Sequence, residues 1–484
     1  MKRITLLLLL LITIVSCKKQ DSYQETEIII TTAGETIEDV EIYRSEQGID
    51  LWSNKVTKLK KNDQGEFVLK LIIDTAEYAR IKAGDNRAIL AVFPGQKYKV
   101  HFTEKTKEFS LDNAKGQEIL NNADRIPAQT FVFLNRFTKD STPELVSKKI
   151  AVLKGKETSK MDSLLATKEI DESFYKYLQK EADFYYANAA VSVADFKSRR
   201  NKALKNDYVA FIEKTLEQYP YSKPDLIPYS WQSYVSENFV SRNVYNSYSR
   251  DQLDDYYDKD SIHFLFAQTI QTEIKEQYKE PIFAYYIINS VKQKRHEKSL
   301  IKIFDDFKTT YPKSSYIKYL EADIQEIKEY QDKIARGLSD DVNIIEDEKV
   351  NTFKDLLSKF KGEKLYVDMW ATWCGPCKKE FEVNHKIDKL LKDNGYKKLY
   401  ISVDRASVKD KWIELIKFYD LAGYHHLANK AFFKHFANNY TNTKKGRVSL
   451  PQYLIIDEKG TIVTKNAPRP SQYKDLERAL KNSK

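Results

Sequence analysis

Two cysteines three positions apart, Cys374 and Cys377, directly follow an apolar stretch from Lys364 to Trp370. The residues from 374 to 394 then have the spacing of an amphipathic helix. This order of strand, Cys-x-x-Cys and helix predicts a dithiol redox centre. The only other cysteine, Cys17, lies in an N-terminal targeting segment, so the two thiols have no partner except each other and a substrate.

The helix is expected to make the two thiols unequal. Cys374 falls at its first turn, where unpaired backbone N–H groups and the positive end of the helix dipole favour thiolate over thiol. We therefore expect Cys374 to be the attacking sulfur. Cys377 lies one turn further along and projects on the same side within disulfide reach, so we expect it to be buried and to resolve the mixed disulfide.

Two other uses of a Cys-x-x-Cys pair fit the sequence poorly. A zinc site needs about four ligands, and the chain has no second cysteine pair. A peroxiredoxin would need threonine where Ala371 stands and proline where Val367 stands. The sequence therefore predicts no metal site at this position.

The segment that carries the cysteines alternates strand and helix patterns. We predict strands over 364–371, 398–404, 452–457 and 461–465, helices over 374–394, 408–419 and 472–481, and a helical insertion around 427–439. Two βα units followed by a hairpin and a terminal helix predict a C-terminal α/β domain, with a mixed sheet flanked by helices, over residues 350–484.

The chain ahead of this segment has two different patterns, which together predict a multidomain protein. Residues 18–114 contain short β-rich runs separated by turn formers, which predict an N-terminal all-β, sandwich-like domain. Residues 115–335 have helical spacing and predict an α-helical middle domain, and the polar, acidic residues 336–349 are typical of a linker. The helical region is rich in tyrosine, which favours a helical core over a tyrosine-lined ligand groove.

Length and charge limit the classes of protein further. A chain of 484 residues is long enough for roughly three domains. Its net charge of +10 comes from 80 basic and 70 acidic residues spread along the chain, with no dense basic tract that carries stacking aromatics. Nucleic acid is therefore not expected as a partner.

The first residues predict export. The basic pair Lys2-Arg3 precedes an apolar run over 4–15, which is too short to span a hydrocarbon core of ~30 Å but typical of a secretory signal. The run ends in Ile-Val-Ser-Cys at Cys17, which resembles the lipobox of bacterial lipoproteins. The resemblance implies a signal peptide over residues 1–17, lipidation of Cys17 and anchoring to a membrane. An ordinary signal peptide with an incidental cysteine is the alternative.

The redox segment itself resembles a known family. The run Val-Asp-Met-Trp-Ala-Thr-Trp-Cys-Gly-Pro-Cys-Lys over 367–378, with Leu450-Pro451 ahead of the late hairpin, is similar to thioredoxin and more closely to the envelope-tethered disulfide reductases of the TlpA/ResA type. The resemblance covers residues 349–484 and implies a thioredoxin-like fold whose redox-active disulfide needs no other cofactor. The front half is similar in organisation to multidomain lipoproteins of this type in Bacteroidota.

The resemblance gives Asp368 a role in proton transfer. This residue matches the buried acid of thioredoxin, and burial would raise its pKa so that it takes the proton of Cys377. A structural, hydrogen-bonded aspartate is the alternative. Thioredoxin has a lysine near that acid, whereas here Tyr400 takes the place of the lysine.

The resemblance also implies a surface that contacts the substrate. Pro451 matches a cis-proline that packs on the disulfide, with a plain strand-start proline as the alternative. Leu450, Trp373, Gly375 and Pro376 match the residues around it. Because the Gly-Pro dipeptide is that of thioredoxin and not that of the oxidising DsbA type, we expect the pair to reduce its substrate.

These observations predict a thiol:disulfide oxidoreductase of the bacterial cell envelope, lipid-anchored and facing the periplasm. Its expected substrates are disulfide-containing exported proteins or maturing cytochrome c apoproteins. The resemblance implies a membrane thiol donor of the DsbD/CcdA type as the source of electrons. The alternative is a tethered binding lipoprotein, in which the front domains capture a peptide or glycan and the thioredoxin-like domain is accessory.

Overall fold

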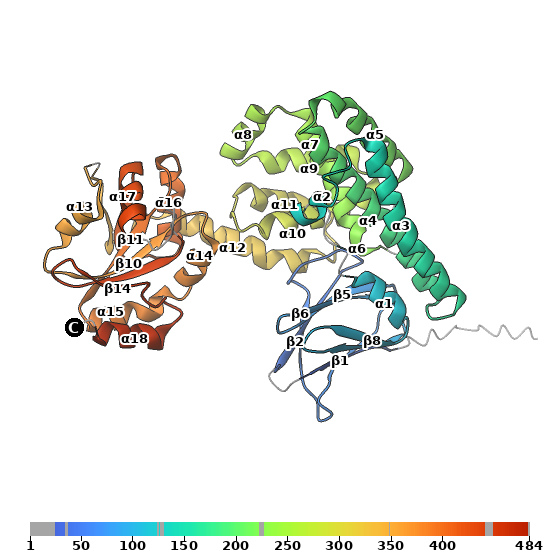
Figure 1. The fold of residues 1–484 in the computed structure, drawn as a ribbon, viewed down its shortest axis with the longest axis horizontal. Helices are drawn as coiled ribbons and strands as arrows, with labels where there is room; N and C mark the ends of the chain where they lie inside the picture. The colour runs from blue at the N-terminus through green and yellow to red at the C-terminus, as the bar shows by residue number, and fades with distance from the viewer. Residues whose placement is uncertain are drawn as a thin grey trace, which may run out of the picture. The chain divides into compact units, whose positions relative to one another are not determined.

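The structure, a computed structural model, describes residues 25–33, 37–122, 125, 130–221, 227–347, 349–440 and 449–482. The predicted signal peptide, residues 1–17, and the predicted lipidation site Cys17 lie outside these ranges. The chain divides into two compact units, one that ends at Ile324 and one that begins at Gln325 (Figure 1). No helix within the described ranges is long and apolar enough to cross a membrane.

The first unit begins with two four-stranded sheets, whose strand orders are β4-β1-β7-β8 and β3-β2-β5-β6. Alternate residues of β1 are buried, as expected for a strand with one face on a core. Apolar residues of both sheets share one buried cluster, so the sheets pack face to face, in agreement with the predicted β region. The strands are β1 (Thr26–Thr32), β2 (Asp39–Arg44), β3 (Val56–Lys60), β4 (Phe67–Leu71), β5 (Glu77–Ala83), β6 (Asn86–Val92), β7 (Lys97–Phe102) and β8 (Lys107–Leu111).

Helices form the rest of the first unit. They are α1 (Ala114–Leu120), α2 (Phe131–Asn135), α3 (Pro143–Ala166), α4 (Glu172–Ser198), α5 (Lys205–Gln218), α6 (Tyr229–Val235), α7 (Arg242–Ser247), α8 (Arg250–Asp258), α9 (Ile262–Glu273), α10 (Glu276–Val291), α11 (Ser299–Thr310) and the beginning of α12 (Ile317–Ala335). A 3-10 turn, η1 (Lys202–Leu204), precedes α5. A π-helical segment, η2 (Ser236–Ser241), joins α6 to α7.

The strands and helices of the first unit share a core. Ala91 of β6 and Phe93, directly after this strand, lie in the same buried cluster as Phe174 of α4. The Gln117 side chain of α1 accepts a hydrogen bond from the backbone N–H of Ala91 at 3.0 Å and donates one to its carbonyl at 2.7 Å. The regions predicted as separate domains over 18–114 and 115–335 are therefore joined in one unit up to Ile324.

The second unit is built on a six-stranded mixed sheet with the order β14-β13-β10-β11-β12-β9. In it, β10 is parallel to β11 and antiparallel to β13. The strands are β9 (Val342–Ile344), β10 (Lys364–Trp370), β11 (Tyr396–Ser402), β12 (Gly423–Leu427), β13 (Gln452–Ile456) and β14 (Ile462–Lys465). The helical elements are α13 (Phe353–Leu357), η3 (Ser358–Phe360), α14 (Gly375–Phe381), η4 (Asn384–Ile387), α15 (Asp388–Asp393), η5 (Ala406–Val408), α16 (Lys409–Phe418), α17 (Lys430–Tyr440) and α18 (Tyr473–Asn482).

Two of these strands are absent from the sequence prediction. β9 lies within residues 336–349, predicted as a linker, and its three residues pair with β12 at the edge of the sheet. β12 itself precedes the predicted helical insertion and carries two buried histidines. It begins at Gly423, where a Cβ atom would lie 2.9 Å from the carbonyl oxygen of Lys398 on β11, so glycine allows the close approach of the two strands.

The helix predicted over 374–394 is interrupted. The structure has α14, then η4, then α15 in this range. The interruption falls at Asn384, whose buried side-chain amide donates a hydrogen bond to the Tyr400 hydroxyl.

The last part of α12 belongs to the second unit. Tyr330 is fully buried in the apolar cluster that also contains Trp370, Trp412 and both cysteines. Its hydroxyl donates a hydrogen bond to the Glu414 carboxylate of α16 at 3.0 Å. The core around the cysteine pair therefore starts upstream of residue 350, the predicted beginning of the α/β domain.

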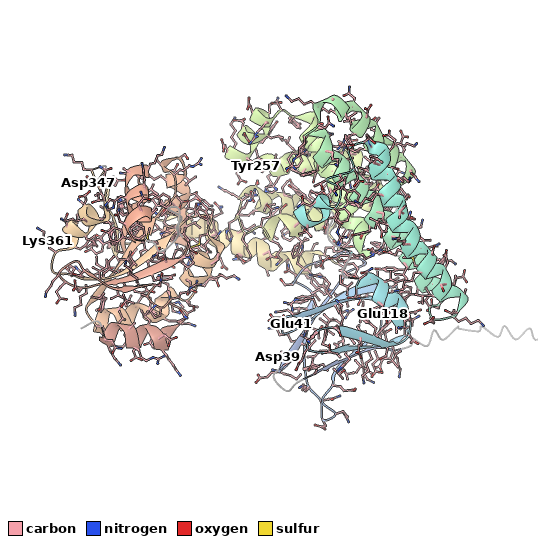
Figure 2. The ribbon with its side chains drawn as sticks, viewed as in Figure 1. Asp39, Glu41, Glu118, Tyr257, Asp347 and Lys361 are labelled. Atoms are coloured by element: carbon pink, nitrogen blue, oxygen red, sulfur yellow. A yellow bond between two sulfur atoms is a disulfide. The ribbon has the colours of Figure 1, made fainter. Side chains whose placement is uncertain are left out.

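Charged side chains of both signs lie on the surface (Figure 2). Asp39 on β2 forms an ion pair with Lys60 on β3, and Asp347 forms one with Lys359 at 2.6 Å.

Candidate active site

Cys374 and Cys377 form a disulfide with a Cα–Cα distance of 5.3 Å. Cys374 is the N-cap of α14, and its sulfur accepts a hydrogen bond from the backbone N–H of Cys377 at 3.2 Å. A thiolate at this place would be stabilised by the same N–H group and by the helix terminus. Cys377 is completely buried, whereas Cys374 keeps 4% of its surface exposed. Of the two residues, Cys374 alone keeps exposed surface. The order of attack stays a prediction.

The turn that carries Cys374 is fixed from the end of β11. Asp404, which is buried, accepts hydrogen bonds from the backbone N–H of Thr372 at 2.7 Å and from its hydroxyl at 2.9 Å. Ser402 donates a third hydrogen bond to the same carboxylate at 2.7 Å. This network holds the segment between β10 and α14, and therefore holds the first cysteine at the edge of the sheet.

Three predicted contact residues lie around the exposed side of the disulfide. The Trp373 side chain is 69% exposed, and Gly375 and Pro376 are exposed in the first turn of α14. A Cβ atom built at Gly375 would meet no heavy atom within 4 Å, so this side is open to an approaching chain. By contrast, Trp370 is fully buried and packs edge-on against Phe381 with the ring centroids 5.0 Å apart.

The structure also brings the late hairpin to the cysteine pair. The Leu450–Pro451 peptide bond is cis, the isomer that the resemblance implies. Leu450 packs against the apolar cluster that contains Cys374 and Cys377. Pro451 immediately precedes β13, which pairs with β10. The two predicted residues therefore lie next to the strand that leads into the active-site turn.

Asp368 is buried on β10, with 3% of its surface exposed. It shares a face of that strand with Trp370, which lies in the same cluster as both cysteines. Burial raises the pKa of Asp368, the Lys398 ammonium opposes this, and the Glu380 carboxylate adds to it, so that the pKa is about 8. Its Oδ1 has no hydrogen-bond partner among the described residues. A carboxyl group with this pKa can exchange a proton near neutral pH.

The sequence prediction missed Glu380, a second buried acid of the site. It lies one turn after Cys377 on α14, and its carboxylate accepts hydrogen bonds from the backbone N–H and the hydroxyl of Ser471, both at 2.9 Å. The sequence did contain a signal for this acid. Glu380 lies three residues after Cys377, which was expected to be buried, and this spacing places both side chains on the inward face of the helix.

The lysine expected near Asp368 is Lys398, which lies two positions before Tyr400 on β11. Tyr400 pairs in register with Asp368, as the alignment predicts, and Lys398 pairs with Tyr366. Because side chains two apart share a face of a strand, Lys398 and Tyr400 both face the side of the sheet on which Asp368 lies. Lys398 is nearly buried, forms an ion pair with Asp388 and donates a hydrogen bond to Asn384 at 3.1 Å. Its own pKa is lowered by burial, which the ion pair opposes.

No group of three or more histidine, cysteine, aspartate or glutamate side chains suited to a metal ion occurs among the residues that the structure describes.

Comparison with known proteins agrees with this geometry. Residues 348–480 match the family described as Redoxin. The C-terminal part of the chain is a redoxin domain. The resemblance to thioredoxin-like disulfide oxidoreductases of the TlpA/ResA type is thereby confirmed for this part of the chain.

Two curated relatives are similar to part of the chain. The thiol-disulfide oxidoreductase ResA of Bacillus thuringiensis is 31% identical over 65 residues, which are 13% of this chain and 36% of the relative. The thioredoxin-like protein YneN of Bacillus subtilis is 30% identical over 112 residues, which are 22% of this chain and 59% of the relative. The chain thus spans between about a third and three fifths of the length of these relatives.

Solved structures also align with about a quarter of the chain. The thioredoxin domain of a thiol-disulfide oxidoreductase from Bacteroides vulgatus is 24% identical, covers 26% of this chain and 82% of its own, and has a TM-score of 0.22. A thiol:disulfide interchange protein from Bacteroides sp. is 26% identical, covers 26% of this chain and 76% of its own, and also has a TM-score of 0.22.

Proposed function

We propose that this protein is a thiol:disulfide oxidoreductase that reduces disulfide-containing exported proteins through Cys374 and Cys377. The observation that carries the proposal is the disulfide itself, with one sulfur reachable at a helix N-cap and the other buried in the core. The redoxin match and the similarity to ResA support it.

The reaction starts from the reduced dithiol. The Cys374 thiolate attacks one sulfur of the substrate disulfide, the substrate S–S bond breaks, and the released thiolate takes up a proton. The Asp368 carboxylate then accepts the proton of the Cys377 thiol. The Cys377 thiolate attacks the Cys374 sulfur, which releases the second substrate thiolate and leaves the protein disulfide. Two electrons pass from the dithiol to the substrate.

Substrate contact is assigned to the rim of the disulfide. Trp373 and Pro376 provide exposed apolar surface beside Cys374. The backbone at Leu450, next to the cis-proline Pro451, lies two residues ahead of β13 and offers a segment with which an extended peptide can pair.

Each turnover consumes the dithiol, so a thiol donor must restore it. A membrane donor of the DsbD/CcdA type and a periplasm-facing, lipid-anchored location in the cell envelope complete the proposal; the sequence around Cys17 supports the location. Expression of the Cys17→Ser protein tests it. Loss of lipid labelling and release from the membrane fraction are expected, and unchanged membrane attachment would contradict the anchor.

Insulin reduction with dithiothreitol tests the activity. The wild type should accelerate precipitation of the insulin B chain, and Cys374→Ser and Cys377→Ser should each abolish turnover. Equal rates in all three proteins would overturn the proposal. The Cys377→Ser protein should in addition accumulate a mixed disulfide at Cys374, which mass spectrometry of envelope extracts would identify together with the substrate.

A further inference from the structure

A cavity of about 420 Å³ lies in the first unit, where the β region meets the helices. Its wall combines Asp50 and Trp52 from the segment after β2, Arg80 from β5, Asn188 from α4, Gln232 from α6 and Tyr285 from α10. None of the residues that line it belongs to the redoxin domain. The volume falls in the range of small-molecule binding sites, which is about 300–1,000 Å³.

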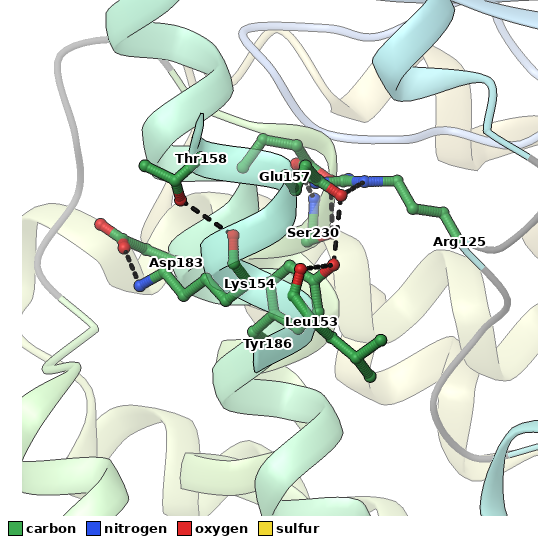
Figure 3. A network of polar contacts seen from close by, with 9 residues as sticks. Arg125, Leu153, Lys154, Glu157, Thr158, Asp183, Tyr186 and Ser230 are labelled. Carbon is green, nitrogen blue, oxygen red and sulfur yellow. Dashed lines mark hydrogen bonds and ion pairs between the residues drawn. The ribbon is translucent and has the colours of Figure 1, made fainter. Parts of the chain in front are cut away.

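The charges in the wall compensate one another. Arg80 forms an ion pair with Asp50 at 2.8 Å. Arg125 pairs with Glu181 at 2.8 Å and with Glu157 of α3 at 2.5 Å (Figure 3). Because opening a buried ion pair leaves an uncompensated charge, a ligand with a net charge would bind here at a penalty. The wall is therefore suited to an uncharged ligand.

Two side-chain amides face the cavity in fixed orientations. The Gln232 carbonyl accepts a hydrogen bond from the backbone N–H of Asp50, and its NH₂ donates one to the Tyr78 hydroxyl, both at 2.7 Å. The Asn188 NH₂ donates to Glu237 at 3.1 Å, and its carbonyl accepts from Asn238 at 2.9 Å. An amide has two donor hydrogens and two acceptor lone pairs, so each keeps capacity for a ligand hydroxyl group.

The remaining wall is mainly aromatic. Trp52, Tyr185, Tyr229 and Tyr285 line the cavity, whereas Ile89 and Leu120 are its aliphatic residues. An aliphatic peptide side chain would find few matching contacts. Aromatic faces combined with planar amides suit a polyhydroxylated ring, whose C–H face stacks on an aromatic ring while its hydroxyl groups pair with the amides.

Trp52 is held in a conformation that needs an explanation. It has φ of 54°, in the left-handed region that a bulky residue rarely adopts. The Asp50 carboxylate accepts a hydrogen bond from its backbone N–H at 2.8 Å, and the Arg80 guanidinium donates one to its carbonyl at 2.9 Å. The indole N–H donates to the Asn289 side chain at 2.8 Å, yet 45% of the residue stays exposed. Strained backbone that holds an aromatic ring at a cavity rim is typical of a ligand clamp.

A second irregularity adjoins the same wall. The π-helical segment η2 (Ser236–Ser241) directly follows α6, which supplies Tyr229 and Gln232 to the cavity. It contains Glu237 and Asn238, the two partners that orient Asn188. Single π-helical turns occur often at functional sites.

We propose that this cavity binds an uncharged saccharide, with one sugar ring stacked on Trp52 and its hydroxyl groups hydrogen-bonded to Asn188 and Gln232. The site is separate from the redox chemistry and does not depend on it. It would give the first unit a binding function of its own.

Isothermal titration of the full chain with three uncharged disaccharides, namely maltose, cellobiose and diacetylchitobiose, tests the proposal. At least one should bind saturably, and Trp52→Ala should weaken its affinity by about tenfold or more. Trp52→Leu keeps apolar bulk without an aromatic face and should weaken it similarly, which covers the case that Trp52→Ala unfolds; circular dichroism melts verify folding. The matched control is Tyr473→Ala, an exposed aromatic residue of the redoxin domain, which should leave the affinity unchanged.

Three results would overturn the proposal. One is the absence of binding by all three disaccharides up to about 10 mM. Another is unchanged affinity in both folded Trp52 variants. The third is tighter binding of a glucuronate-containing disaccharide or of N-acetyl-trialanine amide, which would assign the cavity to a charged ligand or a peptide.

Discussion

The ammonium group of Lys398 on β11 lowers the pKa of the buried Asp368 carboxyl on the neighbouring strand β10. This effect of Lys398 opposes the effect of burial, which is larger, so the pKa of Asp368 is about 8. The ion pair between Lys398 and Asp388 holds the lysine in place. Proton transfer in the redoxin domain should therefore respond to a side chain that touches neither cysteine.

Replacing Lys398 with methionine should raise the pKa of Asp368, because the favourable charge is lost while burial remains. Less of the carboxyl is then ionised near neutral pH, so insulin reduction should fall about threefold near pH 7.5, and the rising limb of the pH profile should move to higher pH. Lys397→Met is the matched control, since Lys397 lies on the same strand but pairs with Glu363 on the surface. A slower rate without a shifted profile would indicate only structural damage.

The opposite shift is expected for Glu380→Gln. Glu380 raises the pKa of Asp368, so its neutral analogue should lower that pKa and move the rising limb of the pH profile to lower pH. Glutamine keeps an oxygen that can accept a hydrogen bond from Ser471. Glu382→Gln, an exposed change just after α14, serves as control. Profiles that move in the same direction in the Lys398 and Glu380 variants would contradict an electrostatic effect on Asp368.

Asp368 should also make the stability of the redoxin domain depend on pH. Its pKa is about 8 in the folded state and ~3.9 in an unfolded chain, so between these values the folded state holds a proton that the unfolded state has released. The free energy of unfolding therefore falls as pH rises through this window; the contribution is fully present below pH ~4 and lost by pH ~8.

Asp368→Asn removes this dependence. The oxidised variant should be more stable than wild type by about 5 kcal/mol near pH 8, on the order of 1.4 kcal/mol for each of about four pH units, and equal to it near pH 4. Urea unfolding followed by tryptophan fluorescence at several pH values measures the difference. The exposed Asp393→Asn change should alter nothing. A variant less stable than wild type at pH 8 would show that the carboxylate is stabilised by partners that the structure does not contain.

The sequence predicted the β10–α14 arrangement because its signals are local: an apolar run, a cysteine pair and a helix pattern. It missed β12 because His425 and His426 look polar in sequence, yet both are buried, and His425 stacks on Tyr400 with ring centroids 4.6 Å apart. Burial lowers the pKa of His425 to about 4, so it is neutral in the core. Such a strand is specified by tertiary packing and not by its own hydrophobicity.

The position of Lys398 relative to Asp368 shows a second limit of prediction from sequence. Alignment by position placed Tyr400 where a lysine was expected, although the two-residue period of a strand puts Lys398 on the same face. That inference was available from the sequence. The ion pair with Asp388 was not, because it depends on the break between α14 and α15.

The redoxin domain should need residues upstream of its family match. Tyr330 is buried among Trp370, Trp412 and the cysteines, and β9 pairs with β12 through Val342 and Ile344. A fragment over 350–484 lacks these contacts, whereas one over 325–484 retains them. Because burying a large apolar side chain contributes ~1.5–3 kcal/mol, the shorter fragment should be less stable by several kcal/mol. Urea unfolding of both fragments measures this.

Tyr330→Ala in the longer fragment separates the helix contribution from that of β9. It should cost about 3–5 kcal/mol, as for other large buried aromatic residues, and should expose the cysteine pair to faster reduction by dithiothreitol. Tyr330→Phe keeps the ring and removes the hydrogen bond that the hydroxyl donates to Glu414 and the one that it accepts from Lys411, so it should cost about 1–3 kcal/mol. If the two fragments unfold at the same urea concentration, the end of α12 contributes nothing to the redox core, and the boundary at residue 350 is correct.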